Sequence, residues 1–105
     1  MSTQLVEQRR QRINLMRGLA NNKTVEQLQK GTEDPWIPKE SFLARCSTMV
    51  LFVRMKVCHE YYKGLVDAGV FEENENGSLF RSVEAIQNYK KQTEKQATLE
   101  SEKST

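Results

Sequence analysis

The sequence contains few of the residues that most catalytic and metal sites require. It has one histidine, His59, and two cysteines in 105 residues. Cys58 and His59 are neighbours, and adjacent residues on a helix point about 100° apart, so a regular helix cannot aim both at one ion. The same geometry argues against a cysteine–histidine nucleophilic pair. We therefore predict two core thiols, one surface histidine, and no bound metal or cofactor.

Glycine is also scarce, with five residues, and none of them belongs to a glycine-rich loop of the kind that cradles phosphates. Neighbouring carboxylates occur in the turn Glu72–Glu75, where solvated acids are ordinary. The sequence thus predicts a protein that is not an enzyme and that acts by binding a partner.

Long hydrophobic runs are absent as well. The longest is Met49–Val53, far short of the roughly 20 residues that span a bilayer. The start, Met1–Arg12, is polar and basic, unlike a secretory signal. Cys46 and Cys58, if they share one helix, lie about 18 Å apart along its axis and cannot pair with each other. Free thiols suit a reducing compartment, so we predict a cytoplasmic protein, or a nuclear one in a eukaryote, with no membrane partner.

The net charge of +2 is unevenly distributed along the chain. Bases concentrate near the N-terminus, whereas residues 67–80 hold acids and no base. Guanidinium groups suit both a phosphate backbone and an acidic protein surface. The candidate contacts are therefore Arg9, Arg10, Arg12 and Arg17. The alternative is an ordinary solvated helix face.

Hydrophobic spacing predicts a mainly α-helical domain. Apolar residues of Thr3–Asn21 fall roughly along one side, which predicts an amphipathic helix. Thr24 then suits the N-cap of a second, short helix that ends at Gly31.

A long central helix is predicted next, because from Lys39 to Leu65 an apolar residue recurs every three or four positions. This helix is either continuous or broken near Arg54–Cys58. A buried strand over Thr48–Val53 is the alternative, because Val and Phe favour strands. The apolar helix could also mediate self-association into a homo-oligomer, through Phe42, Met49 or Phe52.

A short β-hairpin and a final helix follow. Asn76-Gly77 lies between two short apolar pairs, and both residues accept positive φ, which predicts a hairpin turn. Ser82 is a suitable N-cap for the last helix, which we expect to fray beyond Lys91. Residues 1–91 are thus predicted to form a single helical domain, and residues 92–105 a flexible polar tail with too few apolar residues to pack.

Trp36 lies between two prolines just before the central helix. We interpret it as a hydrophobic plug that closes the end of this helix. The alternative is an anchor for a protein partner, because exposed tryptophans often dominate interfaces.

The segment from Leu65 to Tyr89 also resembles a known family. A glycine followed by an apolar residue, a glycine in the next turn and a helix with one apolar face occur in order: Gly69-Val70, Gly77, then Val83, Ile86 and Tyr89. This arrangement is similar to the second half of the winged helix-turn-helix of phage small-terminase and excisionase-like proteins.

The resemblance implies a winged-helix-like domain that binds DNA. The recognition helix would then include His59 to Lys63, with His59, Tyr62 and Lys63 as candidate contacts, and Glu72–Gly77 would form the wing. Two features depart from the family. The run Phe42–Val57 has no glycine where a tight turn is expected, and the wing is acidic although wings on a DNA backbone usually carry Lys or Arg.

Two functions follow from these observations. The first is a small DNA-binding or DNA-packaging accessory protein that uses the basic N-terminal helix and residues 59–63. The second is a helical adaptor or inhibitor that binds a protein partner through the N-terminal helix or the Trp36 region.

Overall fold

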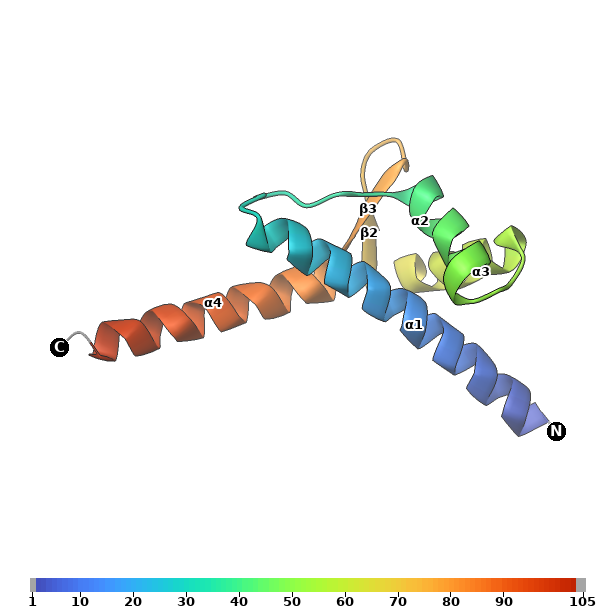
Figure 1. Ribbon diagram of the computed structural model, residues 1–105, viewed down its shortest axis with the longest axis horizontal. Coiled ribbons are helices and arrows are strands. Elements are labelled where there is room, and N and C mark those ends of the chain that lie inside the picture. Colours follow the sequence, from blue (N-terminus) through green and yellow to red (C-terminus); the bar gives the residue numbers. More distant parts are fainter. Residues whose placement is uncertain (1, 104–105) are drawn as a thin grey trace.

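The computed structural model describes residues 2–103, and side chains are described for residues 5–94. Within this range the chain forms four helices, one π-helical turn and a small three-stranded antiparallel sheet (Figure 1). The predicted mainly α-helical class, with a short hairpin, is confirmed.

The first helix, α1, runs without interruption over Ser2–Gln29, where two helices were predicted. Thr24, expected as an N-cap, is fully buried inside the helix, and its hydroxyl donates to the carbonyl of Ala20 at 2.8 Å. Asn21, expected to stop the helix, hydrogen-bonds Glu84 far along the chain. The helix ends at Gln29, and Gly31, whose φ is 92°, closes the turn that follows.

Only the second half of α1 packs along the predicted apolar side. Met16 and Ala20 are completely buried, whereas Leu5 and Val6 are 70% and 57% exposed. The prediction of one apolar side over the whole segment is therefore wrong for the first turns, which extend beyond the body of the domain (Figure 1).

The predicted central helix is broken at residues 51–54. Helix α2 spans Lys39–Arg45, the π-helical turn η1 spans Cys46–Val50, and α3 spans Met55–Asp67. The break lies just before the place where the sequence allowed one, and the strand alternative for Thr48–Val53 is wrong.

Phe52 allows the chain to turn at this break, because its φ is 54°, in the left-handed region. The N–H of Leu51 still bonds Cys46 O, five residues back, at 2.8 Å. The hydroxyl of Ser47 donates to the carbonyl of Val53, and this hydrogen bond holds the chain just after Phe52 against η1. Non-glycine residues in this conformation cost roughly 1–2 kcal/mol.

The three strands form a sheet in the order β1-β3-β2. They span Ile37–Pro38 (β1), Phe71–Glu73 (β2) and Leu79–Ser82 (β3). The turn between β2 and β3 contains Gly77 at φ 72°, as the hairpin prediction requires. The strand β1 was not predicted, because it has only two residues, one of them Pro38, and so gives no alternation to recognise.

The core lies between α1, α2, η1, α3 and the sheet. Phe80 is completely buried, and its ring centroid lies 4.9–5.2 Å from those of Phe42, Tyr62 and Phe71. Cys46 and Cys58 are buried free thiols, and the break in the helix places them on two elements rather than on one. Of the three residues proposed for self-association, Phe42 is buried, whereas Met49 and Phe52 are 66% and 79% exposed.

The last helix, α4, spans Val83–Lys103. Ser82 caps it as predicted, since its Oγ accepts the N–H of Ala85 at 3.3 Å. The helix continues beyond Lys91, where we expected it to fray. Residues 104–105 lie outside the described range, and the flexibility of the polar tail stays a prediction.

Helices α1 and α4 cross near the sheet, and one end of each points away from the body (Figure 1). The radius of gyration is 16.4 Å, larger than the roughly 13 Å of a compact chain of about 100 residues.

Candidate nucleic-acid interface

Helix α3 has one buried face and one open face. The buried residues are Cys58, Tyr61, Tyr62 and Leu65. On the opposite side Lys56, Glu60 and Lys63 are exposed, and His59 is half-buried. Thirteen residues make a helix about 20 Å long, so the open face is a ridge the length of a small recognition element.

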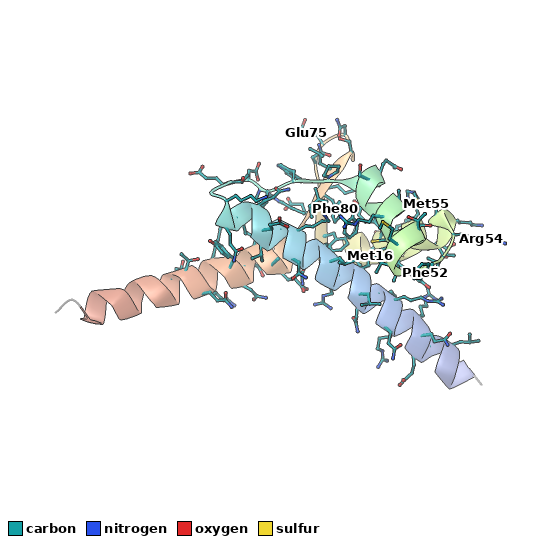
Figure 2. The ribbon with its side chains drawn as sticks, in the orientation of Figure 1. Met16, Phe52, Arg54, Met55, Glu75 and Phe80 are labelled. Carbon is teal, nitrogen blue, oxygen red and sulfur yellow. The ribbon has the colours of Figure 1, made fainter. Side chains whose placement is uncertain are left out.

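Arg54 immediately precedes this ridge. Its carbonyl accepts the N–H groups of Val57 and Cys58 at 2.9 and 3.1 Å, which begins α3. Its side chain is exposed and projects at the end of the domain opposite α4 (Figure 2). Among the described residues, Arg54, Lys56 and Lys63 form no ion pair. Their charges are therefore free for a ligand.

Tyr62 is not part of the open face. It is only 4% exposed, and its hydroxyl donates to Glu73 at 2.8 Å. Burial, and then this contact with the carboxylate, raise the pKa of Tyr62 above its usual range. A surface hollow of about 360 Å³ beside β2 is lined by all three residues predicted on α3, the partly or fully accessible His59 and Lys63 and the buried Tyr62.

Most of the acidic side chains of the predicted wing, residues 72–77, form ion pairs with basic residues of the same domain. Glu73 also pairs with Lys39 at 3.2 Å, and Glu72 pairs with Arg81 at 3.0 Å. The hydrogen bond from Tyr62, and then Lys39, lower the pKa of Glu73, so it stays ionised. Glu75, at the tip of the hairpin, is exposed (Figure 2). Two of the three acids that the sequence placed in the wing are thus paired inside the domain, and Glu75 is the exposed one.

The four predicted arginines of α1 differ in their surroundings. Arg9 and Arg10 are exposed and Arg12 is half-buried. Arg17, by contrast, donates from Nε to Glu84 at 2.8 Å and pairs with the same carboxylate through Nη2. Arg17 therefore joins α1 to α4, and three arginines remain as candidate contacts.

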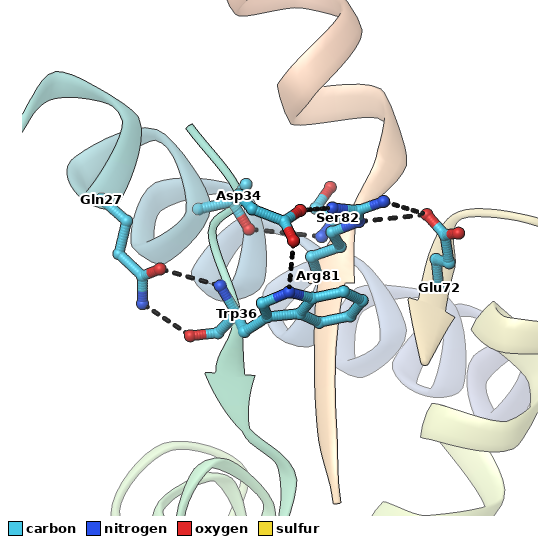
Figure 3. Close-up of polar contacts among 7 residues, drawn as sticks. Gln27, Asp34, Trp36, Glu72, Arg81 and Ser82 are labelled. Carbon is cyan, nitrogen blue, oxygen red and sulfur yellow. Dashed lines mark hydrogen bonds and ion pairs between the residues drawn. The ribbon is translucent and has the colours of Figure 1, made fainter. Parts of the chain in front are cut away.

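Trp36 holds the connection between α1 and β1 in place (Figure 3). Its backbone N–H and carbonyl bond the side chain of Gln27 at 2.9 and 2.8 Å. The indole N–H donates to Asp34 at 2.9 Å, and the guanidinium of Arg81 lies 4.4 Å from the ring centroid. Asp34 also pairs with Arg81. These contacts explain a structural role for Trp36. Its ring is half-buried.

Sequence reasoning missed Arg54, Lys56 and Arg81. Arg54 and Lys56 were interpreted as part of an apolar helix, although bases at a possible break were a usable signal. Arg81 gave no local signal, because its partners Asp34 and Trp36 lie in a distant loop.

Neither a metal site nor a membrane span occurs among the described residues. No three of their histidine, cysteine, aspartate or glutamate side chains gather in a group that could hold a metal ion. No helix among them has the length and apolar character needed to cross a membrane. Comparison of the chain with protein-family models, curated proteins and solved structures finds no match.

Proposed function

We propose that this protein is a small DNA-binding protein, in the DNA-packaging or accessory class, and that α3 contacts the DNA. The observation that carries the proposal is the open face of α3, which presents Lys56 and Lys63, together with Arg54 just before the helix. These three bases have no ion-pair partners among the described residues. A single exposed helix is the element that the major groove, about 12 Å wide, admits.

The neighbouring elements support this proposal. The sequence lacked the tight turn that the winged helix-turn-helix resemblance requires, and the break at residues 51–54 supplies one between α2 and α3. The hairpin follows α3, as a wing would. Since Glu72 and Glu73 are paired internally, the acidity of the wing opposes a phosphate backbone less than its composition suggested.

The test is DNA binding measured by fluorescence anisotropy at several salt concentrations. The triple variant Arg54→Gln, Lys56→Gln, Lys63→Gln should lose more than about tenfold in affinity. Its slope of log K against log salt should fall by about 0.9 for each phosphate that the variant no longer neutralises. The matched control is Lys30→Gln, Lys90→Gln, Lys91→Gln, which removes the same charge from exposed positions outside α3. Equal losses of affinity in both triples would contradict a site on α3, and no salt-dependent binding by the parent would contradict the function itself.

One observation favours the second function, a protein adaptor. Leu5 and Val6 are exposed on the same turns of α1 as Arg9 and Arg10. Replacing Arg9, Arg10 and Arg12 with Gln should weaken DNA binding on any sequence if these residues contact phosphates, with helix content preserved because Gln forms helix about as well as Arg. If DNA binding is unchanged and Leu5→Ser with Val6→Ser abolishes capture of one protein from nuclease-treated extract, the adaptor function is supported instead.

A further inference from the structure

A second surface lies on the side of the domain where α1 runs beside α2 and η1. These elements enclose a hollow of about 310 Å³. Its lining is mainly apolar at the base and polar at the edges: Leu19, Phe42, Cys46 and Val50, with Asn22, Lys23, Glu26 and Arg45 around them. We call this surface the α1–α2 groove. Leu19 and Val50 are only half-buried, so part of the apolar base is open to solvent.

The apolar character continues past the hollow along both helices. Leu15 lies four residues before Leu19, on the same face of α1, and is 53% exposed. Met49, next to Val50 on η1, is 66% exposed. Exposed apolar residues scattered singly are ordinary, but here each lies within four residues of one that lines the groove.

The edges of the groove are positively charged. Lys23 and Arg45 form no ion pair among the described residues, whereas Glu26 pairs with Lys30 at 3.5 Å. Both cations lie close enough to the thiol of Cys46 to lower its pKa, although burial dominates and raises that pKa to about 11. The groove thus combines an apolar base with two unneutralised cations beside it.

We propose that the α1–α2 groove docks an acidic amphipathic helix of a partner protein. Leucine-type residues of such a helix, spaced three and four apart, would cover Leu15, Leu19 and Val50. Its carboxylates would reach Lys23 and Arg45. The apolar base favours a protein over nucleic acid, because phosphates and sugars have no apolar ridge to bury there. This surface is separate from the open face of α3 and does not depend on DNA binding.

The probe is a synthetic, fluorescein-labelled peptide helix with Leu at positions i, i+3, i+4 and i+7 and Glu at the flanking positions. Controls are the same composition in scrambled order and the same helix with Lys in place of Glu. The 105-residue protein should bind the acidic helix at least about tenfold more tightly than either control. Amide signals of Leu19, Lys23, Arg45 and Val50 should shift on binding in a ¹H–¹⁵N spectrum.

Matched variants then locate the site. Lys23→Glu with Arg45→Glu should weaken binding of the acidic helix about tenfold or more and make the Lys peptide the tighter ligand. Lys90→Glu with Lys91→Glu, an equal charge change at exposed positions of α4 outside the groove, should do neither. Met49→Ser should weaken binding without altering the preference for acidic peptides. Circular-dichroism melts check that each variant is folded.

Three outcomes overturn the proposal. The first is equal binding of the ordered and scrambled peptides. The second is a loss of DNA affinity in Lys23→Glu with Arg45→Glu, with no peptide binding by the parent, which would assign the groove to nucleic acid. The third is a concentration-dependent dimer, seen by sedimentation, that these substitutions dissolve, which would assign the groove to a second copy. A failure of DNA binding alone leaves these results unaffected, so the two proposals are tested separately.

Discussion

Two regions of this small domain contribute differently to its stability. The junction, where α1 meets β3 and the start of α4, is formed by Arg17, Asn21, Thr24, Ser82 and Glu84. The corner, residues 46–54 between α2 and α3, contains a π-helical turn and Phe52 at positive φ. In the junction Thr24 and Ser82 are completely buried, whereas in the corner Met49 and Phe52 are 66% and 79% exposed.

The junction shows how a polar network holds a crossing of two helices. The N–H of Ser82 donates to Thr24 Oγ1 at 3.2 Å, and Asn21 links Ser82 with Glu84. Among the described residues, no buried side-chain nitrogen or oxygen lacks a hydrogen-bond partner. The corner instead keeps a strained residue and open apolar side chains, a combination that is common where proteins bind ligands. From this difference we infer that the junction holds α1, β3 and α4 together. The corner instead shapes the two neighbouring surfaces, the α1–α2 groove and the open face of α3.

The largest expected effect breaks the junction. Thr24→Val keeps the shape of the side chain but leaves the buried N–H of Ser82 without its acceptor, which should destabilise the fold by about 1–3 kcal/mol. Thr48→Val is the matched control, because Thr48 makes the same hydroxyl bond to a carbonyl four residues back but is exposed. Urea denaturation measures both. Equal effects would mean that the network of the junction adds nothing beyond ordinary helix contacts.

A smaller effect should depend on pH. The hydrogen bond from Arg17 chiefly lowers the pKa of Glu84, with help from Asn21 and against the effect of burial. Because this pKa is lower in the folded state, the stabilisation is complete above the ordinary value of about 4.3 and is lost as the pH falls through the folded value. Glu84→Gln should therefore cost about 1 kcal/mol at pH 7 and progressively less below pH about 4.

The control for this prediction is Glu60→Gln, at an exposed position on α3 with no ion pair among the described residues. Its effect should stay within about 0.5 kcal/mol. A constant difference between the parent and Glu84→Gln from pH 7 to pH 3 would contradict the role of the Arg17 pair.

The smallest expected effect is a gain of stability at the corner. Phe52→Gly relieves the positive φ and should stabilise the protein by roughly 0.5–1 kcal/mol, although the added freedom of the unfolded chain offsets part of the gain. Phe52→Ala removes the ring but keeps the strain, so it should not stabilise. If Phe52→Gly destabilises by more than Phe52→Ala, the exposed ring contributes to packing and the corner is not a strained site.

Local patterns in the sequence predicted part of this structure well. Asn76-Gly77 marked the hairpin, and Ser82 marked the start of α4, because in both cases the side chain or backbone preference acts within a few residues. The apolar positions that recur between Lys39 and Leu65 also include the core residues Leu43, Cys46 and Leu65.

The remaining features depend on distant partners. Asn21 and Thr24 look like stop and start signals, yet their side chains bond residues of β3 and α4, so α1 continues. The break at residues 51–54 lies within an apolar run and uses Phe52 where a glycine would have revealed it. The candidate site was affected in the same way, since neither the pairing of Arg17 with Glu84 nor the burial of Tyr62 against Glu73 can be read from neighbouring residues.

The order in which the chain folds follows from the span of these contacts. The hydroxyl bond of the corner joins residues six apart, whereas the contacts of the junction join residues 58 and 67 apart. Closing so long a loop costs more chain entropy, so α2, the corner and α3 should form early and α1 should dock last. In stopped-flow measurements Thr24→Val should then mainly speed unfolding, whereas substitutions of Ser47 should slow folding.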